Sequence, residues 1–258
     1  MILNLNIADK SYSADLNKPI DLSVSTGPQG DNPGAFFIEA AKFEPIRVGG
    51  FVGSVAEGGS ANCEVLTLCA HGNSTHTECA GHITHARLSV SDVVPKFMCT
   101  AQLVTAELFD SKCITLSQVK AWLISPVQAI IIRSLPNAIS KKHQQWSGQE
   151  PPYFEPEALA YLRDLGLIHL LTDFPSVDPE VDEGRLSAHH EWWGFSQRVK
   201  EGVAYEMGPS NPRYHATITE LIYVENEVED GLYALNLQIP NLRTDAVPSR
   251  PVIYKLTQ

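Results

Sequence analysis

Four of the nine histidines, His71, His76, His82 and His85, fall within one short segment of the chain, and Glu78 lies among them. Neutral imidazole is the commonest metal ligand in proteins near neutral pH. A carboxylate adds the hard oxygen ligand that is typical of a hydrolytic metal site. The segment from His71 to His82 therefore predicts the core of a divalent-metal site.

The spacing within this segment indicates how its side chains are presented. His76, Glu78 and His82 are separated by even numbers of residues, so on an extended segment they would project to the same side. The segment is rich in Gly, Ser, Thr and Asn, which favours a strand running into a loop. The helical H-E-x-x-H pattern of metalloproteases is absent.

A second group of polar residues follows the apolar run from Leu167 to Leu171, in "LLTDFPSVDPEVDEGRLSAHHEWWGF". Loops that leave strand ends are common places for active sites. We expect this group to supply distant ligands or orienting groups. It consists of Asp173, Asp178, His189 and His190.

The composition excludes several classes of partner. A formal charge of −11 opposes binding to nucleic acid or to an anionic membrane. No long apolar run or basic leader is present, so we expect a cytoplasmic protein. The five cysteines are odd in number and form no C-x-x-C pair, which indicates reduced thiols.

Apolar periodicity predicts an α/β fold in one mixed domain spanning residues 1–258. Helical spacing is found at 115–124, and Pro156 and Gly166 mark the start and end of another helix. Because this helix separates two buried-strand runs, it predicts a parallel βαβ crossover. The expected strands are 2–7, 20–24, 127–135, 167–171, 216–224, 232–239 and 251–256.

Two connections are rich in chain-breaking residues. The segment 27–37 carries three glycines and two prolines, and we expect a loop near the mouth of a site. The long polar segment 136–154 joins the first strand of the crossover to its helix. A connection of this length in a compact domain is more often a functional flap than a plain linker.

The histidine segment resembles the cyclase family of metal-dependent hydrolases, whose signature can be written H-x-G-T-H-x-D-x-P-x-H. In "STHTECAGH", Thr75, His76 and His82 match this signature, and Glu78 stands in the place of its Asp. Ser74 and Ala80 replace the family's Gly and Pro. His71 precedes His76 by five positions instead of four, and we expect a β-bulge to accommodate the extra residue.

The resemblance continues along the chain. "FPSVDP" followed by "SAHH" is similar to a family segment that implies His189 as a metal ligand. "ITELIYVENEVEDGLYALNLQIP" is similar to the segment around the family's last ligand, which implies that role for Glu220. The stretch between them is longer than expected, and its "GPSNPRYH" is interpreted as a substrate-shaping insertion that brings His215 close.

The resemblance implies a swivelling β/β/α fold and a site for one or two divalent ions, zinc or manganese. His71, His76 and Glu78 would bind one ion, and Glu78 with His189 and Glu220 would bridge to a second. Binding of one ion by a subset of these residues also fits.

The implied reaction is hydrolysis of a carbon–nitrogen bond in a small formamide or cyclic amide. A divalent ion lowers the pKa of bound water and polarises the scissile carbonyl. His82 is the candidate general base and acid, and its alternative role is as a further ligand. The family also implies a homodimer or homotetramer.

Other functions also fit these residues. A lactone or cyclic-imide hydrolase would use the same residues, and a metal-binding or ligand-binding protein would hold the ion without turnover. The aromatic residues Phe36, Phe37, Trp192 and Trp193 are candidates for an apolar pocket, although each is more often part of a core.

Overall fold

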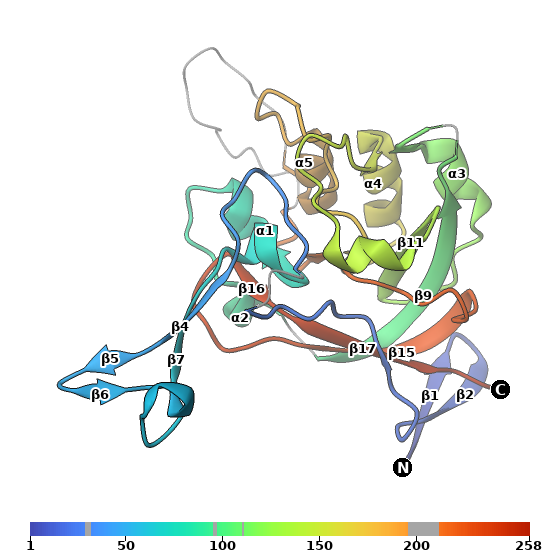
Figure 1. Cartoon of the computed structure of the whole chain (residues 1–258). Coiled ribbons are helices and arrows are strands. Elements are labelled where there is room, and N and C mark those ends of the chain that lie inside the picture. The colour runs from blue at the N-terminus through green and yellow to red at the C-terminus, as the bar shows by residue number, and fades with distance from the viewer. Residues whose placement is uncertain (29–31, 95–96, 110, 196–211) are drawn as a thin grey trace.

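The computed structural model describes residues 1–258 except 29–31, 95–96, 110 and 196–211. A nine-stranded mixed sheet lies at its centre (Figure 1). The strand order is β16 (Ala246–Pro248), β8 (His76–Cys79), β14 (Thr217–Glu220), β13 (His169–Thr172), β11 (Ala129–Leu135), β9 (Met98–Glu107), β15 (Gly231–Gln238), β17 (Arg250–Lys255) and β3 (Ile20–Asp21).

The four central strands β14, β13, β11 and β9 are parallel, and the outer strands pair antiparallel. The predicted crossover is present: β11 leads through α4 (Pro156–Asp164) to the parallel strand β13. Pro156 lies in the first turn of α4, and Gly166 follows its end with a φ of 85°. The α/β fold class predicted from the sequence is therefore confirmed.

Both faces of the sheet are buried. Ile130 and Ile132 on β11 belong to one apolar core, which the helices cover, while Ile131 belongs to a second core on the opposite face. Figure 1 shows α3 (Leu116–Ala121), α4 and α5 (Ser187–Trp193) together on the first face. A strand that is buried on both faces has a nearly continuous apolar sequence, and this pattern allowed β11 to be predicted.

The remaining elements are short. The other helices within the described residues are α1 (Ala70–Asn73), α2 (Val90–Val93) and the 3-10 helices η1 (Val55–Glu57), η2 (Ala80–Ile83) and η3 (Ile139–His143). Four two-stranded sheets are formed by β1 (Ile2–Ile7) with β2 (Lys10–Asp15), β4 (Lys42–Pro45) with β7 (Glu64–Thr67), β5 (Arg47–Val48) with β6 (Phe51–Val52), and β10 (Cys113–Ile114) with β12 (Tyr153–Phe154). None of the described helices is long and apolar enough to cross a membrane.

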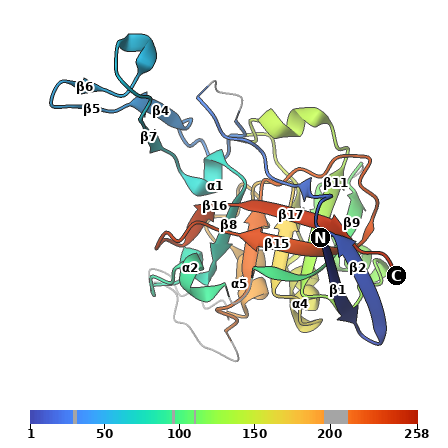
Figure 2. The ribbon, with the colours of Figure 1, turned by 90° about the horizontal axis from the view of Figure 1, so that it is seen from below.

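Residues 42–67, which contain β4 to β7 and η1, form an arm that projects from the body of the protein (Figures 1 and 2). Its ribbon pairs β4 with β7, and every residue of β7 is exposed. This arm was not predicted from the sequence, because its strands are only two to four residues long.

Several strands differ from the predicted ones. The strand expected at 216–224 ends at Glu220, because Leu221 has a φ of 55° and turns the chain away from the sheet. The strand expected at 20–24 pairs only over Ile20–Asp21. Strand β9, the longest in the sheet, was not predicted.

The long connection 136–154 is fixed to the body at several points. The Lys141 ammonium donates to Asp173 at 2.9 Å, and Trp146 is buried. Gly34, in the glycine-rich loop, exchanges backbone hydrogen bonds with Gln144 and Trp146. The glycine-rich loop and the connection 136–154 therefore lie side by side.

Candidate metal centre

The site begins on β8, at the edge of the parallel part of the sheet. His76 and Glu78 are two residues apart on this strand, so both project from one face of it. Both side chains are fully buried. On the opposite face, Thr77 lies 2.8 Å from the hydroxyl of Thr219 and donates to that of Ser249, which fixes β8 in its place.

His82 and His71 lie on short helical turns that flank β8. His82 is carried by η2, so only the strand part of the predicted extended segment is correct. His71 lies on α1. The Asn73 side chain closes this helical turn, because it accepts a hydrogen bond from the backbone N–H of Cys69 at 2.9 Å. A helical turn, and not the expected β-bulge, therefore accommodates the extra residue between His71 and His76.

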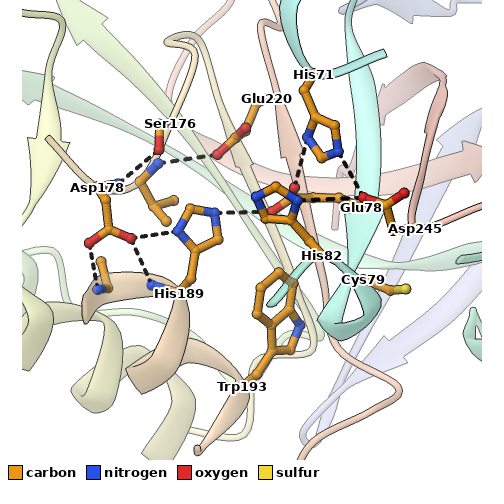
Figure 3. Close-up of polar contacts among 12 residues, drawn as sticks. His71, Glu78, Cys79, His82, Ser176, Asp178, His189, Trp193, Glu220 and Asp245 are labelled. Carbon is orange, nitrogen blue, oxygen red and sulfur yellow. Dashed lines mark hydrogen bonds and ion pairs between the residues drawn. The ribbon is translucent and has the colours of Figure 1, made fainter. Parts of the chain in front are cut away.

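Two further predicted residues arrive from distant segments. Glu220 ends β14 and pairs in register with His76, and its Oε2 lies 3.3 Å from His76 Nε2. His189 lies on α5, and its Nε2 is 3.2 Å from Glu78 Oε1. All six residues predicted for the site are thus brought together, as Figure 3 shows for five of them.

Glu78 lies at the centre of this group. Its Oε2 is 3.2 Å from His71 Nδ1, and its Oε1 faces His189. Ring centroids of His71 and His82 are 4.3 Å apart, and those of His82 and His189 are 5.5 Å apart. One carboxylate therefore separates histidines that come from α1 and α5 (Figure 3).

Asp178, from the second polar group of the sequence, orients His189. Its Oδ2 lies 2.5 Å from His189 Nδ1 and accepts the His189 backbone N–H at 3.1 Å. Its Oδ1 accepts the backbone N–H of Ala188 at 2.7 Å. The prediction of an orienting group in this segment was therefore right for Asp178. Asp173 instead forms the ion pair with Lys141, and His190 packs with its ring 6.4 Å from that of Phe195.

Asp245 belongs to the site and was missed in the sequence. Its Oδ2 is 2.9 Å from His71 Nε2 and 3.5 Å from His82 Nδ1. It precedes β16, whose first residue Ala246 pairs with Glu78. A single aspartate in a turn gives no signal in the sequence, because only the long-range pairing of β16 with β8 brings it near the histidines.

His215 does not join the site. It is exposed and precedes β14, whereas Glu220 ends that strand, so the length of β14 separates the two residues. The insertion predicted at 208–215 lies partly outside the described residues. Trp192 and Trp193 are fully buried, as the core interpretation predicts, whereas Phe37 is exposed, so these aromatic residues do not form one apolar pocket together. The Trp193 ring nevertheless packs 5.6 Å from that of His189.

The donor atoms at the site suit a divalent cation. Three sets of side chains place one potential ligand atom each within 4.8 Å of one another: His71, His76 and Glu78; His71, His82 and Asp245; Glu78, His82 and His189. His76 Nε2 and both Glu78 oxygens are buried, and their partners among the described residues are ionic contacts of 3.2 to 3.3 Å with Glu220, His71 and His189. Buried polar atoms without a close hydrogen-bond partner are rare, and a divalent cation would satisfy these.

The electrostatics of the site follow from the same contacts. Burial raises the pKa of Glu78, but the charge of His82 and the contacts with His189 and His71 outweigh burial and hold this pKa well below its usual range. Burial and the charge of Glu78 raise the pKa of Glu220. Burial lowers the pKa of His189, yet Asp178 and Glu78 raise it to about 10. Glu78 is thus an anion surrounded by imidazoles.

Comparison with known proteins agrees with this geometry. The Cyclase family model matches residues 14–179, and the chain therefore belongs to the cyclase family. Kynurenine formamidase of Bacillus cereus is 23% identical over 242 residues, which cover 93% of this chain and 95% of that protein. Kynurenine formamidase of Bacillus cytotoxicus is 22% identical over 94% of this chain and 97% of that protein.

Solved structures show the same fold. A potential metal-dependent hydrolase with cyclase activity superposes with a TM-score of 0.64 at 14% identity, covering 92% of this chain and 98% of that chain. An isatin hydrolase bound to thioisatinate, a product analogue, gives a TM-score of 0.64 at 12% identity, with 93% of each chain covered. The family predicted from the sequence is confirmed.

Proposed function

We propose that this protein is a metal-dependent hydrolase that cleaves a carbon–nitrogen bond in a formamide or a cyclic amide. The class agrees with the family and with the formamidases that are similar over nearly the whole chain. The observation that carries the proposal is the buried Glu78 carboxylate, whose two oxygens face His71 and His189. A bridging carboxylate between two ligand groups is a common arrangement in hydrolytic two-metal sites.

The residues divide into two ligand groups. His71, His76 and Glu78 would hold one zinc or manganese ion, and Glu78, His189 and Glu220 would hold a second. The Ser74 carbonyl lies 3.0 Å from His76 Nδ1 and so accepts its N–H, which leaves Nε2 available as a ligand atom. A bound divalent ion would supply Lewis-acid activation of water and of the scissile carbonyl.

His82 is suited to proton transfer, because its side chain is 29% exposed and can meet both solvent and substrate. It would take a proton from the attacking water and deliver that proton to the leaving nitrogen. Asp245 would hold the ring through Nδ1, and the ring then presents Nε2 to the reaction. His82 also belongs to two of the three candidate ligand sets, so a ligand role is the alternative.

The test combines elemental analysis with turnover of formanilide by the protein loaded with zinc or manganese. Glu78→Gln should lose bound metal and at least about 1,000-fold in kcat, whereas Glu227→Gln, a change to an exposed carboxylate, should keep both. His82→Gln should keep the metal and lose about 100- to 10,000-fold in kcat. Full metal content and full rate in Glu78→Gln would disprove its ligand role.

A panel of substrates separates the competing functions. Faster turnover of lactones or cyclic imides than of formanilides would indicate the alternative hydrolase. Bound metal without turnover of any of these compounds would indicate a metal-binding or ligand-binding protein.

The chain is also proposed to form a homodimer or homotetramer through the projecting arm. Val48, Val55, Val65 and Leu66 on this arm are each about half exposed or more. An isolated two-stranded ribbon is marginally stable in water, and an exposed apolar patch is typical of an interface. A second copy of this chain is the partner that would cover these side chains.

A further inference from the structure

Asn73 is the last residue of the helical turn that carries His71, and its side chain is buried. Its Oδ1 closes the turn through the backbone N–H of Cys69, and its Nδ2 donates to the Glu39 carbonyl at 3.1 Å. The Thr26 hydroxyl donates to the Asn73 carbonyl, also at 3.1 Å. One residue therefore joins α1 to both flanks of the glycine-rich loop.

The loop with its flanks, residues 26–28 and 32–39, is called the loop segment, and it also packs directly against Gly72 of the same turn. The backbone N–H of Ala35 donates to the Gly72 carbonyl at 3.1 Å. A Cβ at position 72 would lie 2.7 Å from Cδ1 of Ile38 and 3.0 Å from the Ala35 carbonyl oxygen. A larger residue at this position would therefore push α1 and the loop segment apart.

The backbone of the loop segment is strained where it meets α1. Phe36 and Phe37 have φ values of 58° and 54°, in the left-handed region that is costly for a residue with a Cβ. Such strain persists only where the surrounding contacts over-determine the conformation. The Phe37 N–H donates to the Ser147 hydroxyl oxygen at 2.8 Å, from the connection 136–154. The loop segment is thus fixed from two sides and forms a firm support for α1.

This support determines where His71 lies relative to Glu78. Glu78 is placed by the pairing of β8 with β14 and β16, whereas α1 lies outside the sheet. The two residues meet at 3.2 Å, between His71 Nδ1 and Glu78 Oε2. Asp245 contacts the other ring nitrogen and so directs the ring, but the backbone of α1 is held by Asn73 and the loop segment. Ligand atoms must be placed within about 0.5 Å for a metal site to work.

We infer that Asn73 is a positioning residue, which holds His71 at its distance from Glu78 and thereby sets the affinity of the centre for its metal. The inference rests on the proposed function for the ligand role of His71. Asn73 acts through the backbone of α1 and through the loop segment, and its side chain contacts neither His71 nor Glu78. Its loss should therefore be seen first in metal binding.

The experiment measures zinc affinity by competition with a fluorescent chelator. Asn73→Ala removes both side-chain hydrogen bonds and should weaken zinc binding by about 10- to 100-fold. Gly72→Ala keeps the Asn73 side chain but displaces α1 from Ile38, and it should weaken zinc binding at least about fivefold. If Asn73→Ala does not fold, Gly72→Ala decides.

Asn137→Ala is the matched control. Asn137 is also buried, and its Nδ2 donates at 2.8 Å to the Val224 carbonyl and to Oδ1 of Asn226, neither of which belongs to α1 or the loop segment. This variant should unfold at a lower urea concentration and keep wild-type zinc affinity. A loss of affinity as large as that of Asn73→Ala would reduce Asn73 to a general structural role and overturn the inference.

The remaining outcomes separate the inference from the proposed function. Wild-type zinc affinity in a folded Asn73→Ala, or in Gly72→Ala, would overturn the inference even if the protein hydrolyses formanilide. The expected affinities without turnover of any amide would support the inference while the proposed function fails. A wild type that binds no zinc would overturn the inference, because His71 would then not be a ligand.

Discussion

The Nδ1 atom of His189 lies 2.5 Å from Oδ2 of Asp178, and this contact leaves the other ring nitrogen facing Glu78. The same carboxylate accepts two backbone N–H groups at the start of α5. The helix and the imidazole are thus held by one side chain. Partners of this kind fix the tautomer and direction of a metal-binding histidine.

Asp178→Asn should therefore weaken zinc binding by about 10- to 100-fold, because an amide nitrogen cannot accept the His189 Nδ1 proton. The fold should persist, since the amide oxygen can still accept backbone N–H groups. Competition with a fluorescent chelator measures the affinity. Glu180→Gln changes a neighbouring acid that accepts the Gly148 N–H and contacts no described ligand residue, and it should retain wild-type affinity. Equal affinity in Asp178→Asn would remove the orienting role.

Gly81→Ala should slow hydrolysis without touching a ligand atom. A Cβ at position 81 would lie 2.3 Å from the Leu88 carbonyl oxygen, so the backbone of η2 must shift and carry His82 with it. A displacement of about 1 Å at a catalytic group can cost about 100-fold in rate. Gly27→Ala is the control, because its Cβ would meet nothing within 4 Å among the residues that the structure describes. Steady-state kcat on formanilide is the measurement, and a wild-type value would contradict the argument.

The parts of the site that the sequence predicts are those set by local pattern. His76 and Glu78 alternate on one strand, so their common direction follows from the spacing alone. The boundaries of α4 follow from Pro156 and Gly166, whose backbone preferences act within one turn. Such signals need no knowledge of the rest of the fold.

The parts that were missed depend on contacts between distant segments. Asp245 reaches the site only through the pairing of Ala246 with Glu78, which are far apart in the chain. The turn that carries His71 spans four residues, too few for a helical period to be read. His215 is only five residues from Glu220 in the sequence, and it was therefore expected near the site. Strand β14 lies between the two residues, so Glu220 is at the site and His215 is not.

The arm offers a test of assembly. Leu66 lies on β7 and is 55% exposed in the isolated chain. Leu66→Glu would place a charge in the proposed interface, so it should shift the protein towards the monomer in sedimentation velocity. Leu123→Glu makes the same change on the body, at a side chain that is 86% exposed, and should leave the oligomer intact. A wild type that sediments as a monomer at micromolar concentration would refute the arm as an interface.

His169 should make the stability of the fold depend on pH. It is fully buried on β13, and its Nδ1 lies 2.8 Å from the Thr217 hydroxyl. Burial, with the nearby charges of His215 and Arg213, lowers its pKa from 6.5 to about 4. Between pH 6.5 and 4 the unfolded chain therefore binds a proton that the folded chain does not.

The free energy of unfolding should accordingly fall as the pH falls through this window, by about 3 kcal/mol from this residue. His169→Gln cannot be protonated, so its curve against pH should be flatter than that of the wild type by this amount. Urea unfolding of both proteins at pH 7, 5.5 and 4, with metal present at a fixed excess over its Kd at each pH, measures the difference. Parallel curves would show that His169 is protonated equally in the folded and unfolded chains, against the burial seen on β13.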